Sequence, residues 1–160
     1  MRTSLYIETS VVSYLTARPS RDLITAARQQ ITTAWWASRR AQYDLFISPL
    51  VLEEAELGDL SAAAARIAVL QELTMVTPRA EADALAEALL QKTPLPEKAA
   101  ADAVHIAIAT TSGAEYLLTW NFKHIANPVL REQIMQLCRS MGYMPPTLCT
   151  PEDLLEGTAL

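Results

Sequence analysis

The stretch Tyr116-Leu117-Leu118-Thr119 is short and almost wholly apolar. This composition is typical of a strand that is buried on both faces, as in a parallel sheet covered by helices. An alanine-rich helix is predicted before this strand, over 97–112, and Gly113 is predicted to end it. A second helix is predicted after the strand, over 128–141. The order of helix, buried strand and helix indicates an α/β protein.

The same alternation extends over the rest of the chain. Further strands are predicted over 5–7, 43–47, 75–77 and, at an edge of the sheet, 147–149. Further helices are predicted over 10–15, with Ser10 as the capping residue, and over 22–41, 50–57, 62–73 and 80–91. A chain of 160 residues fits one compact domain. We therefore expect a single domain over residues 1–150 with a mainly parallel sheet, and a peripheral C-terminal tail over residues 151–160.

The charge of the chain is unevenly distributed. Thirteen Lys and Arg stand against 18 Asp and Glu, which gives a net charge of −5. This average argues against a protein that binds nucleic acid through bulk positive charge. Residues 1–40, however, contain six arginines and two acids, whereas residues 41–91 contain two arginines and nine acids. A basic surface is therefore possible only locally, in the N-terminal quarter.

Several classes of protein are excluded or disfavoured by composition. The four glycines are too far apart to form a glycine-rich phosphate loop, which excludes classical dinucleotide enzymes and P-loop NTPases. Cys138 and Cys149 lack C-x-x-C spacing and predict reduced, partly buried thiols. No apolar run approaches the length of a membrane span, and the N-terminus has no signal-peptide pattern, so we expect a cytoplasmic protein.

Two acids, Glu8 and Asp102, occupy positions that indicate a role for their charge. Glu8 directly follows the predicted strand over 5–7, and sites in open α/β sheets lie at the carboxyl ends of strands. The simpler interpretation of Glu8 is a solvated acid at a strand end. Asp102 lies among small apolar residues, and a buried carboxylate needs a partner or a metal. Its simpler role is to favour the helix dipole, but Asp102 lies about a turn and a half beyond the predicted helix start at Pro96, where that effect fades.

Other polar side chains follow the predicted strands and their helices. The helix over 50–57 places Glu53 and Glu54 near its core face, and the sequence leaves open which of the two points inward. Asn121 follows the strand over 116–119 and offers an oxygen at the same edge of the sheet. Carboxylates gathered at one edge favour Mg²⁺ or Mn²⁺ over zinc. His105 is predicted to be a buried core histidine, and His124 to bond within its loop or to contact a phosphate.

Four segments together resemble the PIN-domain family, and in particular the small bacterial VapC-like toxins. They are residues 6–12 (YIETSVV), 48–54 (SPLVLEE), 101–107 (ADAVHIA) and 118–125 (LTWNFKHI). Each segment alone is degenerate, but their order and spacing match the family over roughly residues 4–150. The resemblance implies a PIN-like three-layer α/β/α sandwich with a central, mainly parallel five-stranded sheet. It also implies a divalent-metal-dependent endoribonuclease that a cognate antitoxin holds inactive.

The resemblance also implies a set of site residues. The family's acids fall on Glu8, on Glu54 in preference to Glu53, and on Asp102, while its fourth acid falls on Asn121. The small hydroxyl that follows the first acid falls on Ser10 or Thr9. Mg²⁺ or Mn²⁺ is then expected on the three carboxylates, with the serine and the asparagine in support, so that a metal-activated water hydrolyses the RNA phosphodiester.

The expected partners are RNA, the antitoxin and a second copy of the chain. The residues expected to bind the RNA backbone are Arg18, Arg21, Arg28 and Lys123. Trp35 and Trp36 are adjacent on a predicted helix and cannot both face the core. One of them is therefore expected at a protein interface, in a homodimer or against the antitoxin, or in stacking on a base.

Two other functions are compatible with parts of the sequence. Glu8 and Asn121 both depart from the aspartate that is usual in the family, which favours a catalytically weakened PIN-like binding or regulatory module. An unrelated Mg²⁺-dependent phosphohydrolase of small substrates is the third candidate. The absence of a D-x-D pair and of a phosphate loop argues against it.

Overall fold

The computed structural model describes residues 1–156 and contains one five-stranded sheet. Its strands are β1 (Thr3–Ile7), β2 (Tyr43–Ile47), β3 (Thr74–Met75), β4 (Tyr116–Leu118) and β5 (Thr147–Cys149). Their order across the sheet is β3-β2-β1-β4-β5, and every neighbouring pair is parallel. β1 is the central strand, because Leu5 pairs with Leu45 of β2 on one side and with Tyr116 of β4 on the other.

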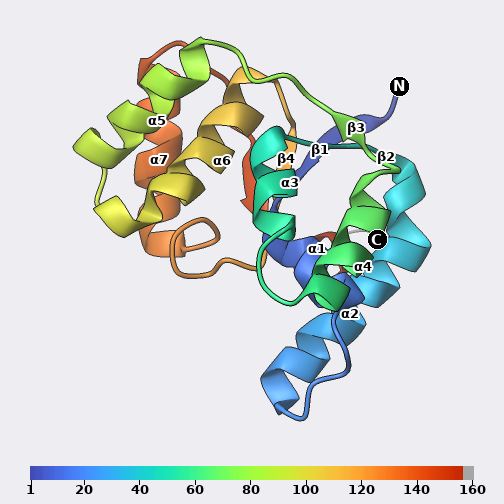
Figure 1. Cartoon of the computed structure of the whole chain (residues 1–160). Coiled ribbons are helices and arrows are strands. Elements are labelled where there is room, and N and C mark those ends of the chain that lie inside the picture. The colour runs from blue at the N-terminus through green and yellow to red at the C-terminus, as the bar shows by residue number, and fades with distance from the viewer. Residues whose placement is uncertain (157–160) are drawn as a thin grey trace.

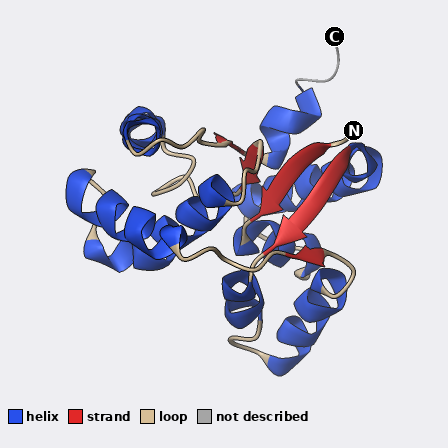
Figure 2. Ribbon diagram, turned by 90° about the horizontal axis from the view of Figure 1, so that it is seen from above, coloured by secondary structure: helices blue, strands red, loops and turns tan. Residues whose placement is uncertain are grey.

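Helices cover the sheet in two groups (Figure 1). They are α1 (Thr9–Thr16), α2 (Leu23–Arg39), α3 (Pro49–Ala55), α4 (Leu60–Leu70), α5 (Glu81–Lys92), α6 (Ala100–Thr111), α7 (Pro128–Ser140) and α8 (Pro151–Glu156). Helix α1 packs against α2, α3 and α4, whereas α5 packs against α6 and α7. Figure 2 shows helices on either side of the strands. The predicted three-layer α/β/α fold with a five-stranded sheet is confirmed.

The central strands form the middle of the core. Leu5, Tyr6 and Ile7 of β1 and Leu117 and Leu118 of β4 are all inaccessible to solvent. Both faces of these strands are therefore covered, as the apolar run 116–119 predicts. The carboxyl ends of β1 and β4 are adjacent and buried beneath this double cover, which gives the residues that follow them a largely dry environment.

Two of the differences between predicted and observed helix starts concern candidate site residues. Helix α1 begins at Thr9, and its N-cap is Glu8 rather than Ser10, because the Glu8 carboxylate accepts the backbone N–H of Ser10. A tight 3-10 turn over Glu97–Ala99 precedes α6, so the α-helix begins three residues later than Glu97. Asp102 consequently lies in the first turn of α6, where the helix dipole does favour an acid.

The C-terminal segment begins with a short helix. Pro151–Glu156 form α8, which packs against α2, and Pro151 itself is buried. Residues 157–160 of the predicted tail lie outside the described residues. None of the helices in the described part of the chain combines the length and the apolar character that a membrane span requires.

Both cysteines are free and buried, which predicts that they react slowly. Burial raises the pKa of the Cys138 thiol, and it raises the pKa of Cys149 to about 12. Because the thiolate is the reactive form, we expect neither thiol to react with an aromatic disulfide reagent at pH 8 in the native protein. In denaturant both should react at once, as the absorbance of the released thiolate will measure. One equivalent released rapidly from native protein would contradict this prediction.

Candidate active site

The carboxylate of Glu8 is the most enclosed acid at the carboxyl end of the sheet. Glu8 directly follows β1 and is only 6% exposed. Its backbone N–H donates to the carbonyl of Leu118 over 3.0 Å, which ties it to β4. Its side chain accepts the backbone N–H of Ser10 (3.0 Å), the hydroxyl of Ser10 (2.5 Å) and the hydroxyl of Thr119 (2.6 Å). All three groups donate hydrogen bonds to the Glu8 carboxylate and hold it at the start of α1.

The same hydroxyls fix the loop that follows β4. The Ser10 hydroxyl oxygen accepts the backbone N–H of Trp120 over 2.8 Å. The Thr119 hydroxyl oxygen accepts the backbone N–H of Asn121 over 2.9 Å. Glu8, Ser10 and Thr119 therefore link the first helix to this loop, although more than a hundred residues separate them in sequence.

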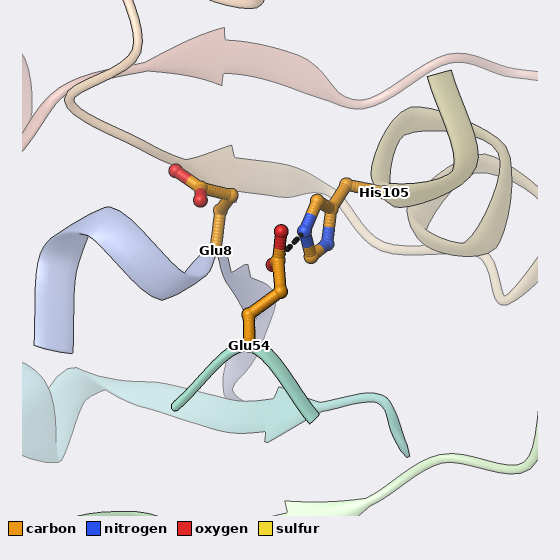
Figure 3. A group of neighbouring side chains, drawn as sticks. All are labelled: Glu8, Glu54 and His105. Atoms are coloured by element: carbon orange, nitrogen blue, oxygen red, sulfur yellow. Dashed lines mark hydrogen bonds and ion pairs between the residues drawn. The ribbon is translucent and has the colours of Figure 1, made fainter. Parts of the chain in front are cut away.

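Glu54 of α3 points into the site (Figure 3). Its neighbour Glu53 is exposed. Glu54 Oε1 accepts the hydroxyl of Thr9 over 2.6 Å and lies 2.5 Å from Nε2 of His105. Burial alone would raise the pKa of Glu54, but the hydrogen bond and charge of His105, together with the bond from Thr9, outweigh it and lower that pKa. Glu54 is therefore ionised at neutral pH.

His105 of α6 completes a compact group with the two glutamates. It is fully buried, and its Nδ1 lies 2.7 Å from the hydroxyl of Tyr6. One side-chain donor atom from each of Glu8, Glu54 and His105 lies within 4.8 Å of the others. Figure 3 shows these side chains converging from the end of β1, from α3 and from α6.

Asp102 forms a second cluster and is not a member of the first. Its Oδ1 accepts the side-chain amide of Asn121 over 2.9 Å, and its Oδ2 lies 2.8 Å from Nδ1 of His124. The side-chain oxygen Oδ1 of Asn121 accepts the backbone N–H groups of Lys123 and His124. The hydrogen bond from the Asn121 backbone to Thr119 joins this cluster to that of Glu8. The predicted residues thus fall into two linked clusters rather than one.

Two solved structures share this fold. One is the VapC20 toxin of Mycobacterium tuberculosis, described as cleaving the sarcin–ricin loop, with a TM-score of 0.58 and 20% identity over 75% of this chain and 92% of that chain. The other is a chain of VapBC2 from Rickettsia felis, bound to a DNA fragment from the promoter, with a TM-score of 0.53 and 12% identity over 92% of this chain and 98% of that chain. The chain therefore shares the fold of these VapC and VapBC proteins. No protein-family model and no curated protein matches the sequence.

The VapC-like fold brings His105 to the site, which the sequence does not predict. The prediction of a buried core histidine is confirmed, since both ring nitrogens are hydrogen-bonded inside the protein. Its contact with Glu54 goes beyond that prediction. The sequence signal for placing His105 near the site is its spacing from Asp102. His105 follows Asp102 by three residues on α6, and side chains three apart share a helix face.

The predicted basic residues lie at different distances from the site of this VapC-like fold. The Arg28 guanidinium lies 4.7 Å from the ring centre of Phe122 and 5.8 Å from that of Trp120, so it borders the loop that carries Asn121. Lys123 is exposed on the same loop. Arg18 and Arg21 are exposed in the segment between α1 and α2, at the protruding end of that helix pair (Figure 1).

The donor set fits a hard divalent cation. Glu8 is nearly inaccessible, yet within the described part of the chain no Lys or Arg forms an ion pair with Glu8, Glu54 or Asp102. A buried carboxylate without a cationic partner is costly, and a bound cation would offset that cost. Oxygen ligands of this kind suit Mg²⁺ or Mn²⁺.

Proposed function

We propose that this protein is a divalent-metal-dependent endoribonuclease and the toxin of a type II toxin–antitoxin pair in the cytoplasm. The observation that carries the proposal is the pair Glu8 and Glu54, of which Glu8 is nearly inaccessible at the end of β1 and Glu54 is partly buried on α3, without a Lys or Arg partner among the described residues. The fold supports it, because one structure that shares it is a toxin described as cleaving RNA of the sarcin–ricin loop.

In this proposal Glu8, Glu54 and Asp102 hold Mg²⁺ or Mn²⁺. A bound ion of this kind polarises a phosphodiester oxygen and lowers the pKa of a coordinated water, which makes that water a nucleophile. Ser10 and Thr119 keep the Glu8 carboxylate fixed through their hydroxyls. Thr9 and His105 do the same for Glu54.

Asn121 has a positioning part in the proposed site. Its side-chain N–H donates to one oxygen of Asp102, while its backbone N–H donates to Thr119, which in turn donates to Glu8. Asn121 therefore ties the orientation of the third acid to that of the first. Because it is neutral, it adds no charge to the three carboxylates, and one ion is better supported than two.

RNA binding is supported by a local basic and aromatic surface rather than by the net charge. Arg28 stacks over Phe122, which is 41% exposed, and Lys123 is the next residue on the same loop. Arginine and an exposed ring beside a carboxylate site suit a phosphate and an unstacked base. Arg18 and Arg21 extend this rim along the segment between α1 and α2 in the proposal.

An antitoxin and a second copy of the chain are the proposed protein partners. Leu23 is 86% exposed and Ile24 is 65% exposed, and both line a groove of about 340 Å³ together with Arg28 and Phe122. A protein segment that covered these two apolar side chains would also cover Arg28. Such a segment would therefore exclude RNA from the rim, which is how an antitoxin could inhibit the enzyme.

A second function is favoured by the surroundings of Asp102. Both of its oxygens already accept hydrogen bonds, one from Asn121 and one in the pair with His124. A carboxylate satisfied in this way does not need a cation. This observation favours a catalytically weakened binding or regulatory module, in which the acids serve to hold the loop after β4.

Metal-dependent cleavage of labelled RNA separates these two functions. The purified protein should cleave RNA, tested first on a fragment that contains the sarcin–ricin loop, in Mg²⁺ or Mn²⁺ and not in EDTA. Asp102→Asn should lose this activity while retaining its thermal midpoint. Equal residual cleavage by both proteins, with no metal bound in calorimetry, would contradict the nuclease and support the binding module.

A further inference from the structure

A line of buried hydrogen bonds leads from the end of β2 to the carboxylate of Glu54. The Ser48 hydroxyl lies 2.8 Å from the Tyr6 hydroxyl, which lies 2.7 Å from Nδ1 of His105. Nε2 of the same histidine contacts Glu54 Oε1 at 2.5 Å. Ser48, Tyr6 and His105 are all inaccessible to solvent. Because these groups are buried, each depends on the next for its hydrogen bond.

One tautomer of His105, with the proton on Nε2, fits every contact in this line. The carboxylate of Glu54 is ionised and can only accept, so Nε2 of His105 carries the proton that it donates. In the tautomer with its proton on Nε2, Nδ1 is an acceptor, and the Tyr6 hydroxyl, 2.7 Å away, donates to it. Burial raises the pKa of Tyr6 far above its usual range, so the phenol keeps this proton. Ser48 in turn donates to the Tyr6 oxygen.

The distance between Nε2 of His105 and Oε1 of Glu54 is too short for these two atoms to bind the same metal ion. Two donor atoms that bind one ion at right angles at about 2.1 Å lie about 3 Å apart. Nε2 and Oε1 are 2.5 Å apart, which is the spacing of a strong hydrogen bond. Thr9 donates to the same Oε1, and among the described residues Oε2 accepts no hydrogen bond. The free oxygen is thus the one left for a ligand.

We infer that His105 is a positioning residue that fixes the Glu54 carboxylate for the cation, and that Tyr6 and Ser48 hold the imidazole in the tautomer that this needs. The inference rests on the proposed function, since it assigns Glu54 to the metal. A histidine that orients a metal-binding carboxylate without touching the ion is an outer-shell residue. Mutation of such a residue typically lowers metal affinity by about 10- to 100-fold.

Mn²⁺ affinity of the metal-free protein tests this inference without recourse to activity. His105→Leu removes the donor and should raise the calorimetric Kd for Mn²⁺ by about 10- to 100-fold. His105→Gln places an amide N–H near the position of Nε2 and should restore most of the affinity. Tyr6→Phe removes only the hydroxyl and should weaken Mn²⁺ binding less than His105→Leu does. The thermal midpoint of each metal-free variant shows whether it folds.

The outcomes are distinguishable. Wild-type Mn²⁺ affinity in a folded His105→Leu overturns the inference and leaves the proposed function intact, as does a His105→Gln that binds no better than His105→Leu. If His105→Leu does not fold, Tyr6→Phe decides, because unchanged Mn²⁺ binding in that variant overturns the inference. Failure of the wild-type protein itself to bind Mn²⁺ overturns the proposed function and this inference with it.

Discussion

Glu54→Gln should lower the rate of metal-dependent RNA cleavage by about 100-fold or more, whereas Glu53→Gln should leave it unchanged. The side chain of Glu54 is ionised, points into the site and is held by Thr9 and His105, while Glu53 is exposed on the same helix. Removing the charge of Glu54 removes one proposed ligand, and ligand binding to the ion contributes several kcal/mol to the transition state. Single-turnover cleavage of labelled RNA at saturating Mg²⁺ measures the effect.

Glu53→Gln is the matched control for this prediction. It makes the same chemical change one residue earlier on α3 and alters the net charge by the same amount. A general electrostatic effect on RNA binding would therefore lower the activity of both variants alike. Equal losses in the two variants, or full activity in Glu54→Gln, would remove Glu54 from the proposed site.

Trp35→Ala should destabilise the fold by about 3–5 kcal/mol, the largest effect expected of any single truncation in α2. Trp35 is inaccessible to solvent, and its ring centre lies 5.9 Å from that of Tyr43 at the start of β2. The loss would leave a large cavity between α2 and the sheet. Its indole N–H has no hydrogen-bond partner within residues 1–156, so the substitution costs packing alone. Urea denaturation followed by tryptophan fluorescence gives the free energy of unfolding.

Trp36→Ala is the comparison for this truncation. Trp36 is only half-buried, with the guanidinium of Arg40 lying 4.4 Å from its ring centre. Its truncation should cost clearly less than that of Trp35, because much of its surface already meets solvent. A larger loss for Trp36 than for Trp35 would contradict the packing described for α2.

Most of the fold is encoded in local patterns and is readable from the sequence. The strands over 43–47 and 147–149 have the predicted bounds, and the short strand predicted over 75–77 lies at Thr74–Met75. Apolar runs and turn residues act over a few positions, so they mark such elements well. The 3-10 turn before α6 is different, because a tight turn and an α-helical turn differ too little in sequence to be distinguished there.

The candidate site was predictable only in part, because it depends on packing between distant helices. Strand ends predict Glu8 and Asn121, and helix spacing narrows the second acid to Glu53 or Glu54. Only the approach of α3 to α6 decides that Glu54 meets His105. No local pattern encodes that contact. The separation of Asp102 into its own cluster likewise follows from the loop after β4, whose course the sequence leaves open.

The central position of β1 has a consequence for the synthesis of the protein. β1 is synthesised more than a hundred residues before its neighbour β4 and before Thr119, whose hydroxyl donates to Glu8. A nascent chain on the ribosome therefore contains Glu8 long before the residues that bury Glu8 have been synthesised. Domains fold as units during translation, so the site cannot assemble until about three quarters of the chain has emerged. In the proposed function, this order would delay any ribonuclease activity until the residues that enclose Glu8 have been synthesised.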